Sequence, residues 1–197
     1  MLAAAYAGHS LIGSADAAAG DEPHDLPAAW HAGDLVADAE TGRITQEEFE
    51  RRLAAALSDG LAQPLDPVDL GLRLFASLRP DPAMRSAVAA ARTQGFHTVM
   101  VSNTWGPIRS EQAQRIDDLF DDVVRSDEVG VRKPDPEIYL IAAARAVAAP
   151  EACVFVDDIP VNVEGARAVG MAGVLHRHAA ITIPKLEELL GVGLSRP

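Results

Sequence analysis

From residue 80 onward, short apolar runs alternate with segments in which apolar residues recur at helical spacing. Four runs have the length and composition of strands: residues 98–101, 123–124, 154–156 and 173–176. Residues 83–94 and 161–169 predict helices that end at glycines, and the sequence Asp-Pro-Glu from Asp135 predicts the start of another helix. Strands that alternate with helices predict an α/β fold with a doubly wound parallel sheet.

The preceding segment, residues 26–79, carries a helical pattern without strand-like runs. Thr45 and Glu48 stand three residues apart, the spacing of a capping box, ahead of apolar residues at helical spacing. The chain therefore divides into an N-terminal stretch at residues 1–25, a helical segment at residues 26–79 and an α/β core at residues 80–197.

Composition narrows the classes of partner. The chain has 197 residues and a formal net charge of -12, which argues against nucleic acid and anionic membranes as partners. A small phosphorylated metabolite is not excluded, because it responds to the local field of a pocket. No apolar run reaches the ~18 residues that span a bilayer. The single cysteine, Cys153, fits a packed thiol in a reducing compartment, so we expect a cytoplasmic protein.

Polar clusters follow three of the predicted elements. Ser102 and Asn103 come directly after the first strand, Lys133 precedes a proline, and Asp157 and Asp158 follow the third strand. Ligands of open parallel sheets bind beyond the carboxyl ends of the strands, where hydroxyl, ammonium and carboxylate groups can hold a phosphoryl group and a cation. Each cluster also has a plainer interpretation: a turn, a solvated lysine and a helix cap.

The sequences around these clusters resemble the motifs of the haloacid dehalogenase superfamily, subfamily IA. Within it they resemble the phosphatase group typified by the N-terminal domain of soluble epoxide hydrolase. The matching stretches are "VMVSNTWG", "EVGVRKPDPEIYLIAAARAV" and "CVFVDDIPVNVEGARAVGM". The segment "WHAGDLVADAETGRITQEEFERRLAAAL" is similar to the small helical cap of the family. The resemblance covers about residues 26–178 and implies a Rossmann-like sheet with a helical cap.

The resemblance also implies a phosphoryl-binding role for three residues. Ser102 would bind a phosphoryl oxygen, with Asn103 beside it as a second substrate-binding residue. Lys133 would bind the phosphoryl group and neutralise the charge that develops during its transfer. The implied reaction is hydrolysis of a small phosphomonoester.

The same resemblance implies a Mg²⁺ site. Asp158 would be the direct metal ligand, Asp157 would support it, and Asn162 would order the loop. Paired aspartates favour a Mg²⁺-dependent phosphatase over a haloacid dehalogenase, whose matching loop is not diacidic in this way.

One motif of the family is absent. In the family, the first strand of the sheet ends in Asp-x-x-Gly or Asp-x-Asp, and the first Asp attacks phosphorus. Nothing before Trp30 fits, and no apolar run leads up to Asp16. The central strand of the sheet is therefore predicted to be missing, which would leave its neighbours unpaired. Either the natural protein begins further upstream, or residues 10–13 or another subunit fill the slot.

Three hypotheses follow from the sequence. The first is a phosphatase with impaired turnover, and the second is a pseudophosphatase that binds a phosphorylated ligand or regulates another protein. The third is a structural or dimerisation module. The oligomeric state stays open, a homodimer included, and so does the identity of the substrate.

Overall fold

The computed structural model describes residues 3–6, 12–13, 34–58, 63–74, 79–106 and 118–194. At its centre is a five-stranded parallel sheet in the order β5-β4-β1-β6-β7. Its strands are β1 (Ala3–Tyr6), β4 (His97–Ser102), β5 (Asp122–Arg125), β6 (Cys153–Asp157) and β7 (Ala172–Leu175). The predicted α/β architecture with a doubly wound parallel sheet is confirmed, and all four predicted strands form within it.

The prediction of a missing central strand was wrong. β1 occupies the central slot, with Ala5 level with Val99 of β4 on one side and Phe155 of β6 on the other. Part of the stretch at residues 1–25, residues 3–6, therefore belongs to the core sheet. Alanine favours helices, so this run carries no strand signal of its own. The two flanking strand edges, with backbone groups that need partners, decide its conformation.

Of residues 10–13, the structure describes Ile12 and Gly13, and these two do not fill the slot either. β2 (Ile12–Gly13) pairs antiparallel with β3 (Arg79–Pro80) in a separate two-stranded sheet. This small sheet joins the two chain segments on either side of the helical cap.

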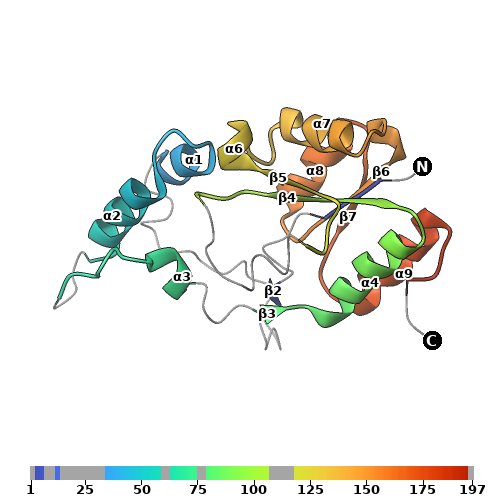
Figure 1. Ribbon diagram of the computed structural model, residues 1–197, viewed down its shortest axis with the longest axis horizontal. Helices are drawn as coiled ribbons and strands as arrows, with labels where there is room; N and C mark the ends of the chain where they lie inside the picture. Colours follow the sequence, from blue (N-terminus) through green and yellow to red (C-terminus); the bar gives the residue numbers. More distant parts are fainter. Residues whose placement is uncertain are drawn as a thin grey trace.

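Helices cover both faces of the central sheet (Figure 1). One face is covered by α7 (Pro136–Arg145) and α8 (Pro160–Ala168), the other by α4 (Pro82–Thr93) and α9 (Ala179–Leu190). Short elements, α6 (Ser126–Val129) and the 3-10 helix η2 (Pro150–Ala152), flank α7. None of the helices in the described residues is long and apolar enough to cross a membrane.

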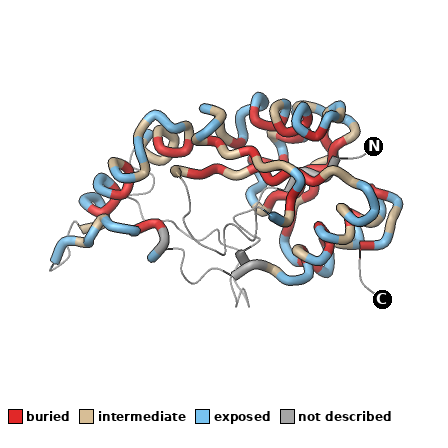
Figure 2. The backbone as a smooth tube through the Cα atoms, in the orientation of Figure 1, coloured by how far each residue is buried: buried red, intermediate tan, exposed pale blue. Residues whose placement is uncertain are grey.

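Alternation along the strands builds two apolar cores. Val99 and Val101 of β4 pack with α7, whereas Met100 between them packs with α4 and α9 on the opposite face. Phe155 of β6, fully buried, meets Tyr139 of α7 edge to face with ring centroids 5.0 Å apart. Figure 2 shows buried residues along β4 and the inward sides of these helices.

The cap consists of α1 (Leu35–Glu40), α2 (Gln46–Leu57) and α3 (Leu70–Leu74), which lie together at one end of the sheet (Figure 1). Thr45 caps α2 as predicted, and its hydroxyl accepts a hydrogen bond from Glu48 N. The capping box is only half formed, because the Glu48 carboxylate pairs with arginines of α2 instead. The cap has its own small core, in which Phe49 and Leu53 are fully buried.

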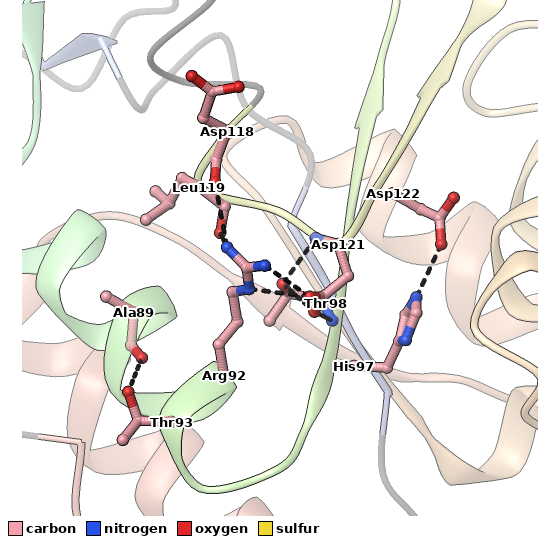
Figure 3. Close-up of polar contacts among 9 residues, drawn as sticks. All are labelled: Ala89, Arg92, Thr93, His97, Thr98, Asp118, Leu119, Asp121 and Asp122. Carbon is pink, nitrogen blue, oxygen red and sulfur yellow. Dashed lines mark hydrogen bonds and ion pairs between the residues drawn. The ribbon is translucent and has the colours of Figure 1, made fainter.

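A polar cluster at the amino end of β4 ties the sheet to α4 (Figure 3). Arg92 Nε donates to Asp121 Oδ1 at 2.9 Å, and Asp121 Oδ2 accepts bonds from both the backbone N and the hydroxyl of Thr98. Burial raises the pKa of the Asp121 carboxyl, but the bonds from Thr98 and Arg92 outweigh it and lower the pKa overall. This cluster lies at the strand end opposite the predicted site.

Candidate active site

The carboxyl ends of the three central strands define the predicted site. β4 ends at Ser102, β6 ends at Asp157, and β1, between them, ends at Tyr6. The loop after β4 supplies Asn103, the loop before α7 supplies Lys133, and Asp158 and Asn162 follow β6. The polar clusters that the sequence placed at strand ends therefore do gather at one edge of the sheet.

Lys133 and Asp157 form a buried ion pair. Lys133 Nζ lies 2.9 Å from Asp157 Oδ2, and the two side chains are only 2% and 1% exposed. The carboxylate also accepts hydrogen bonds from Ile159 N at 2.8 Å and from Asn162 Nδ2 at 3.1 Å. Burial raises the pKa of Asp157, and the Lys133 ammonium together with the Ile159 N–H opposes that rise. Both oxygens of Asp157 are thus committed within the protein.

Asn103 holds the backbone of Lys133. Its Oδ1 accepts from Lys133 N at 2.9 Å, and its Nδ2 donates to Lys133 O at 3.1 Å. Asn103 is itself buried. The sequence proposed a substrate contact for this side chain, which stays a prediction. The geometry gives its carboxamide a positioning task, because it fixes the residue that carries the ammonium group.

Lys133 bridges two strands that are not neighbours. β1 separates β4 from β6, so their ends lie two strand spacings apart, about 10 Å. Asn103 anchors the Lys133 backbone on the β4 side, and Asp157 holds its ammonium group on the β6 side. Lys133 therefore links the loop after β4 to the end of β6.

Asp158 carries the oxygen that best fits a cation. Its Oδ1 is buried and accepts no hydrogen bond from any residue that the structure describes. A buried carboxylate oxygen without a partner is costly, and a metal ion is one way to satisfy it. The neighbouring Asp157 adds negative charge at the same strand end. Oxygen ligands of this kind suit Mg²⁺, so the residues present fit the ion that the resemblance implies.

The loop after Ser102 is held by a residue that sequence reasoning missed. Ser126, at the start of α6 and fully buried, accepts a hydrogen bond from Thr104 N at 2.9 Å. The sequence gives no hint of the contact between Ser126 and Thr104, because that contact depends on where α6 packs.

The start of α8 is fixed by a second missed residue. Tyr139 of α7 donates its hydroxyl to Asn162 O at 2.7 Å, while the Asn162 side chain reaches Asp157. Burial, followed by the nearby Asp157 carboxylate, raises the pKa of Tyr139 above its usual range. Gly165 allows this approach, since a Cβ there would lie 2.8 Å from Pro134 O and 2.9 Å from the Tyr139 hydroxyl. Asn162 therefore links α7 to the end of β6, and the role in ordering the loop that the resemblance implied stays a prediction.

The described residues of β1 supply no attacking carboxylate. β1 ends at Tyr6, and the first acidic residue of the sequence is Asp16. The described residues thus place no carboxylate of β1 at the strand end that lies between Ser102 of β4 and Asp157 of β6.

Two groups of known proteins resemble the chain in sequence. Bifunctional epoxide hydrolase 2 of Rattus norvegicus is 30% identical over 151 residues, which cover 74% of this chain and 27% of that protein. The chain thus spans about a quarter of the length of that relative. Phosphatase MT3486 of Mycobacterium tuberculosis is 32% identical over 149 residues, which cover 74% of this chain and 68% of that protein.

Solved structures share the fold. A predicted HAD-like family hydrolase from Porphyromonas gingivalis has a TM-score of 0.69 at 22% identity, with 96% of this chain and 98% of that chain covered. A HAD family enzyme from Bacteroides thetaiotaomicron, solved as a magnesium complex, has a TM-score of 0.67 at 18% identity, with 90% and 93% covered. The family model of haloacid dehalogenase-like hydrolases matches residues 3–170. The chain therefore belongs to the haloacid dehalogenase-like hydrolase family.

Proposed function

We propose that the chain binds Mg²⁺ and the phosphoryl group of a small phosphorylated metabolite, as a phosphomonoester hydrolase with impaired turnover. The observation that carries this proposal is the unpartnered buried oxygen of Asp158 beside the buried Lys133–Asp157 pair. Asp158 would hold the ion and Asp157 would support it. Bound Mg²⁺ would supply charge that stabilises the phosphoryl oxygens.

The residues of this chain would divide the work on the phosphoryl group. The Ser102 hydroxyl donates a hydrogen bond to one of its oxygens. The Lys133 ammonium attracts its negative charge in a site with little water, where such attraction is strong. Asn103 and Asn162 keep Lys133 and Asp157 in place. These tasks bind and orient a phosphomonoester without requiring a covalent step.

Relatives support the choice of phosphate chemistry. Phosphatase MT3486 is named as a phosphatase. So is a glyceraldehyde 3-phosphate phosphatase of Methanopyrus kandleri, which is 35% identical over 103 residues. The net charge of -12 would repel nucleic acid but does not exclude a small anionic ligand, which responds to the local field of a pocket. The single cysteine, Cys153, supports a cytoplasmic location.

Impaired turnover follows from the missing carboxylate. Loss of a covalent nucleophile removes rate by about a thousandfold or more and leaves the contributions of binding and charge stabilisation. The alternative is a pseudophosphatase, which binds a phosphorylated ligand for regulation and does not hydrolyse it. β1 fills the central slot, and no acidic residue stands between its end at Tyr6 and Asp16, which favours this alternative.

Calorimetry with inorganic phosphate and an assay with a generic aryl phosphate, each with and without Mg²⁺, test the proposal. We expect Mg²⁺-dependent phosphate binding that Asp158→Asn abolishes. Glu164→Gln is a matched control, because that carboxylate lies on the exposed side of α8. Slow, Mg²⁺-dependent turnover supports the enzyme, whereas binding without turnover supports the pseudophosphatase. Phosphate binding that is absent or indifferent to Asp158→Asn would overturn both.

A further inference from the structure

The end of α1 in the cap docks directly onto the core. Glu40, its last residue, is only 5% exposed although it is a carboxylate. Two residues on, Gly42 adopts φ 68°, and a Cβ there would lie 2.5 Å from the Asp127 carbonyl oxygen of α6. The cap thus approaches the core so closely that only glycine fits. Asp127 lies in the segment that leads to Lys133.

Glu40 meets the residue that precedes the predicted catalytic lysine. Arg132 Nε lies 2.9 Å from Glu40 Oε2, in ion-pair contact. The hydrogen of Nε is directed at Lys133 O, 3.4 Å away, so the contact with Glu40 is one of charge. Lys133 O therefore accepts from both Asn103 Nδ2 and Arg132 Nε. The Glu40 carboxylate of the cap attracts the Arg132 guanidinium, and this guanidinium donates a hydrogen bond to Lys133 O.

Stability does not account for a carboxylate at this place. Burial raises the pKa of Glu40, and attraction to Arg132 and to Lys133 only partly offsets the rise. The ionised side chain therefore lowers the stability of the fold, as incompletely compensated buried charges do. Glu48 of α2 is a useful contrast, because it pairs with two exposed arginines inside the cap and touches no core residue among its described partners. A buried carboxylate that costs stability beside a ligand site suggests a task at that site.

The loop after β4 makes a second cap contact. Trp105, three residues after Ser102, packs on Phe49 of α2 with ring centroids 5.0 Å apart. Both loops that carry phosphoryl-binding residues are therefore attached to the cap. Among the contacts of the described residues, the Glu40–Arg132 ion pair leads, through the hydrogen bond from Arg132 Nε, to the backbone of Lys133.

We propose that Glu40 is a positioning residue that acts through Arg132 to fix the Lys133 backbone, so that docking of the cap sets the phosphoryl affinity of the core. The inference rests on the proposed function, because it assumes that Lys133 binds a phosphoryl group. It adds a residue of the cap to a site that otherwise consists of core residues.

The test compares inorganic phosphate affinity, measured by calorimetry with saturating Mg²⁺, with thermal stability in the same variants of the full chain. Glu40→Gln keeps the shape of the side chain and removes its charge. We expect it to weaken phosphate binding by about threefold to tenfold without lowering the melting temperature. Glu48→Gln, the matched control, should leave the phosphate affinity within about twofold of the wild type. Glu48 pairs with exposed arginines of α2, and such pairs contribute little free energy.

A double variant shows whether the two residues act as a unit. Arg132→Gln should weaken phosphate binding to the same extent as Glu40→Gln, and Glu40→Gln/Arg132→Gln should weaken it no further. Unchanged affinity in Glu40→Gln, or independent losses that multiply in the double variant, would overturn the inference while leaving the proposed function standing. A wild-type chain without Mg²⁺-dependent phosphate binding would overturn both.

Discussion

Replacing Lys133 by methionine tests the buried ion pair on which the site depends. Methionine has a similar length and volume but no ammonium group, so the variant leaves the Asp157 carboxylate, 1% exposed, without its charged partner. Two neutral hydrogen bonds to that carboxylate, from Ile159 and Asn162, remain. The reverse change, Asp157→Asn, leaves the Lys133 ammonium buried instead.

The expected cost follows from the burial of both groups. Removing one partner of a buried pair typically lowers the free energy of unfolding by about 3–5 kcal/mol, because the remaining charge is uncompensated. For a chain of this size, that corresponds to a fall in melting temperature of about 10 °C. The double variant Lys133→Met/Asp157→Asn carries no buried charge, so it should lose no more than about 2 kcal/mol.

Urea unfolding of the wild type, both single variants and the double variant completes a cycle from which the coupling energy is obtained. We expect a coupling of at least about 3 kcal/mol, nearly unchanged in 1 M NaCl because salt screens buried pairs weakly. Single variants that each cost less than about 1 kcal/mol, or costs that simply add in the double variant, would refute the buried pair.

Three further predictions concern other groups. Burial raises the pKa of Glu40 on folding, so the side chain lowers stability increasingly as the pH rises above 4.5. Glu40→Gln should therefore exceed the wild type in urea stability at pH 7 and match it near pH 4. The pKa of Asp121 is lowered on folding, so its effect on stability has the opposite sign. The ionised Asp121 stabilises the fold above pH 3.8, and this stabilisation is lost at lower pH. Asp121→Asn should therefore destabilise the protein at pH 7 and converge with the wild type in acid. Gly42→Ala should cost about 3 kcal/mol or more by thermal unfolding, because strain adds to a clash with the core. Gly95→Ala is its control, with φ 87° but nothing within 4 Å of the added Cβ, and should cost about 1 kcal/mol.

Several features of this protein are local, and the sequence by itself determined them. The apolar runs at residues 98–101 and 154–156 lie within β4 and β6, and Asp135 caps α7 by accepting a hydrogen bond from Glu137 N. Thr45 caps α2 in the same way. A buried strand requires consecutive apolar residues and a helix start requires a capping oxygen, so neighbours in sequence suffice to predict both.

Other features exist only in the tertiary structure. The alanine-rich residues of β1 form the central strand because β4 and β6 present backbone groups on either side, and no pattern within the segment says so. Asn103 holds Lys133, and Glu40 of the cap reaches Arg132, across 30 and 92 positions of sequence respectively. Such contacts depend on strand order and on how the cap docks, which are settled by packing between distant segments rather than by local preference.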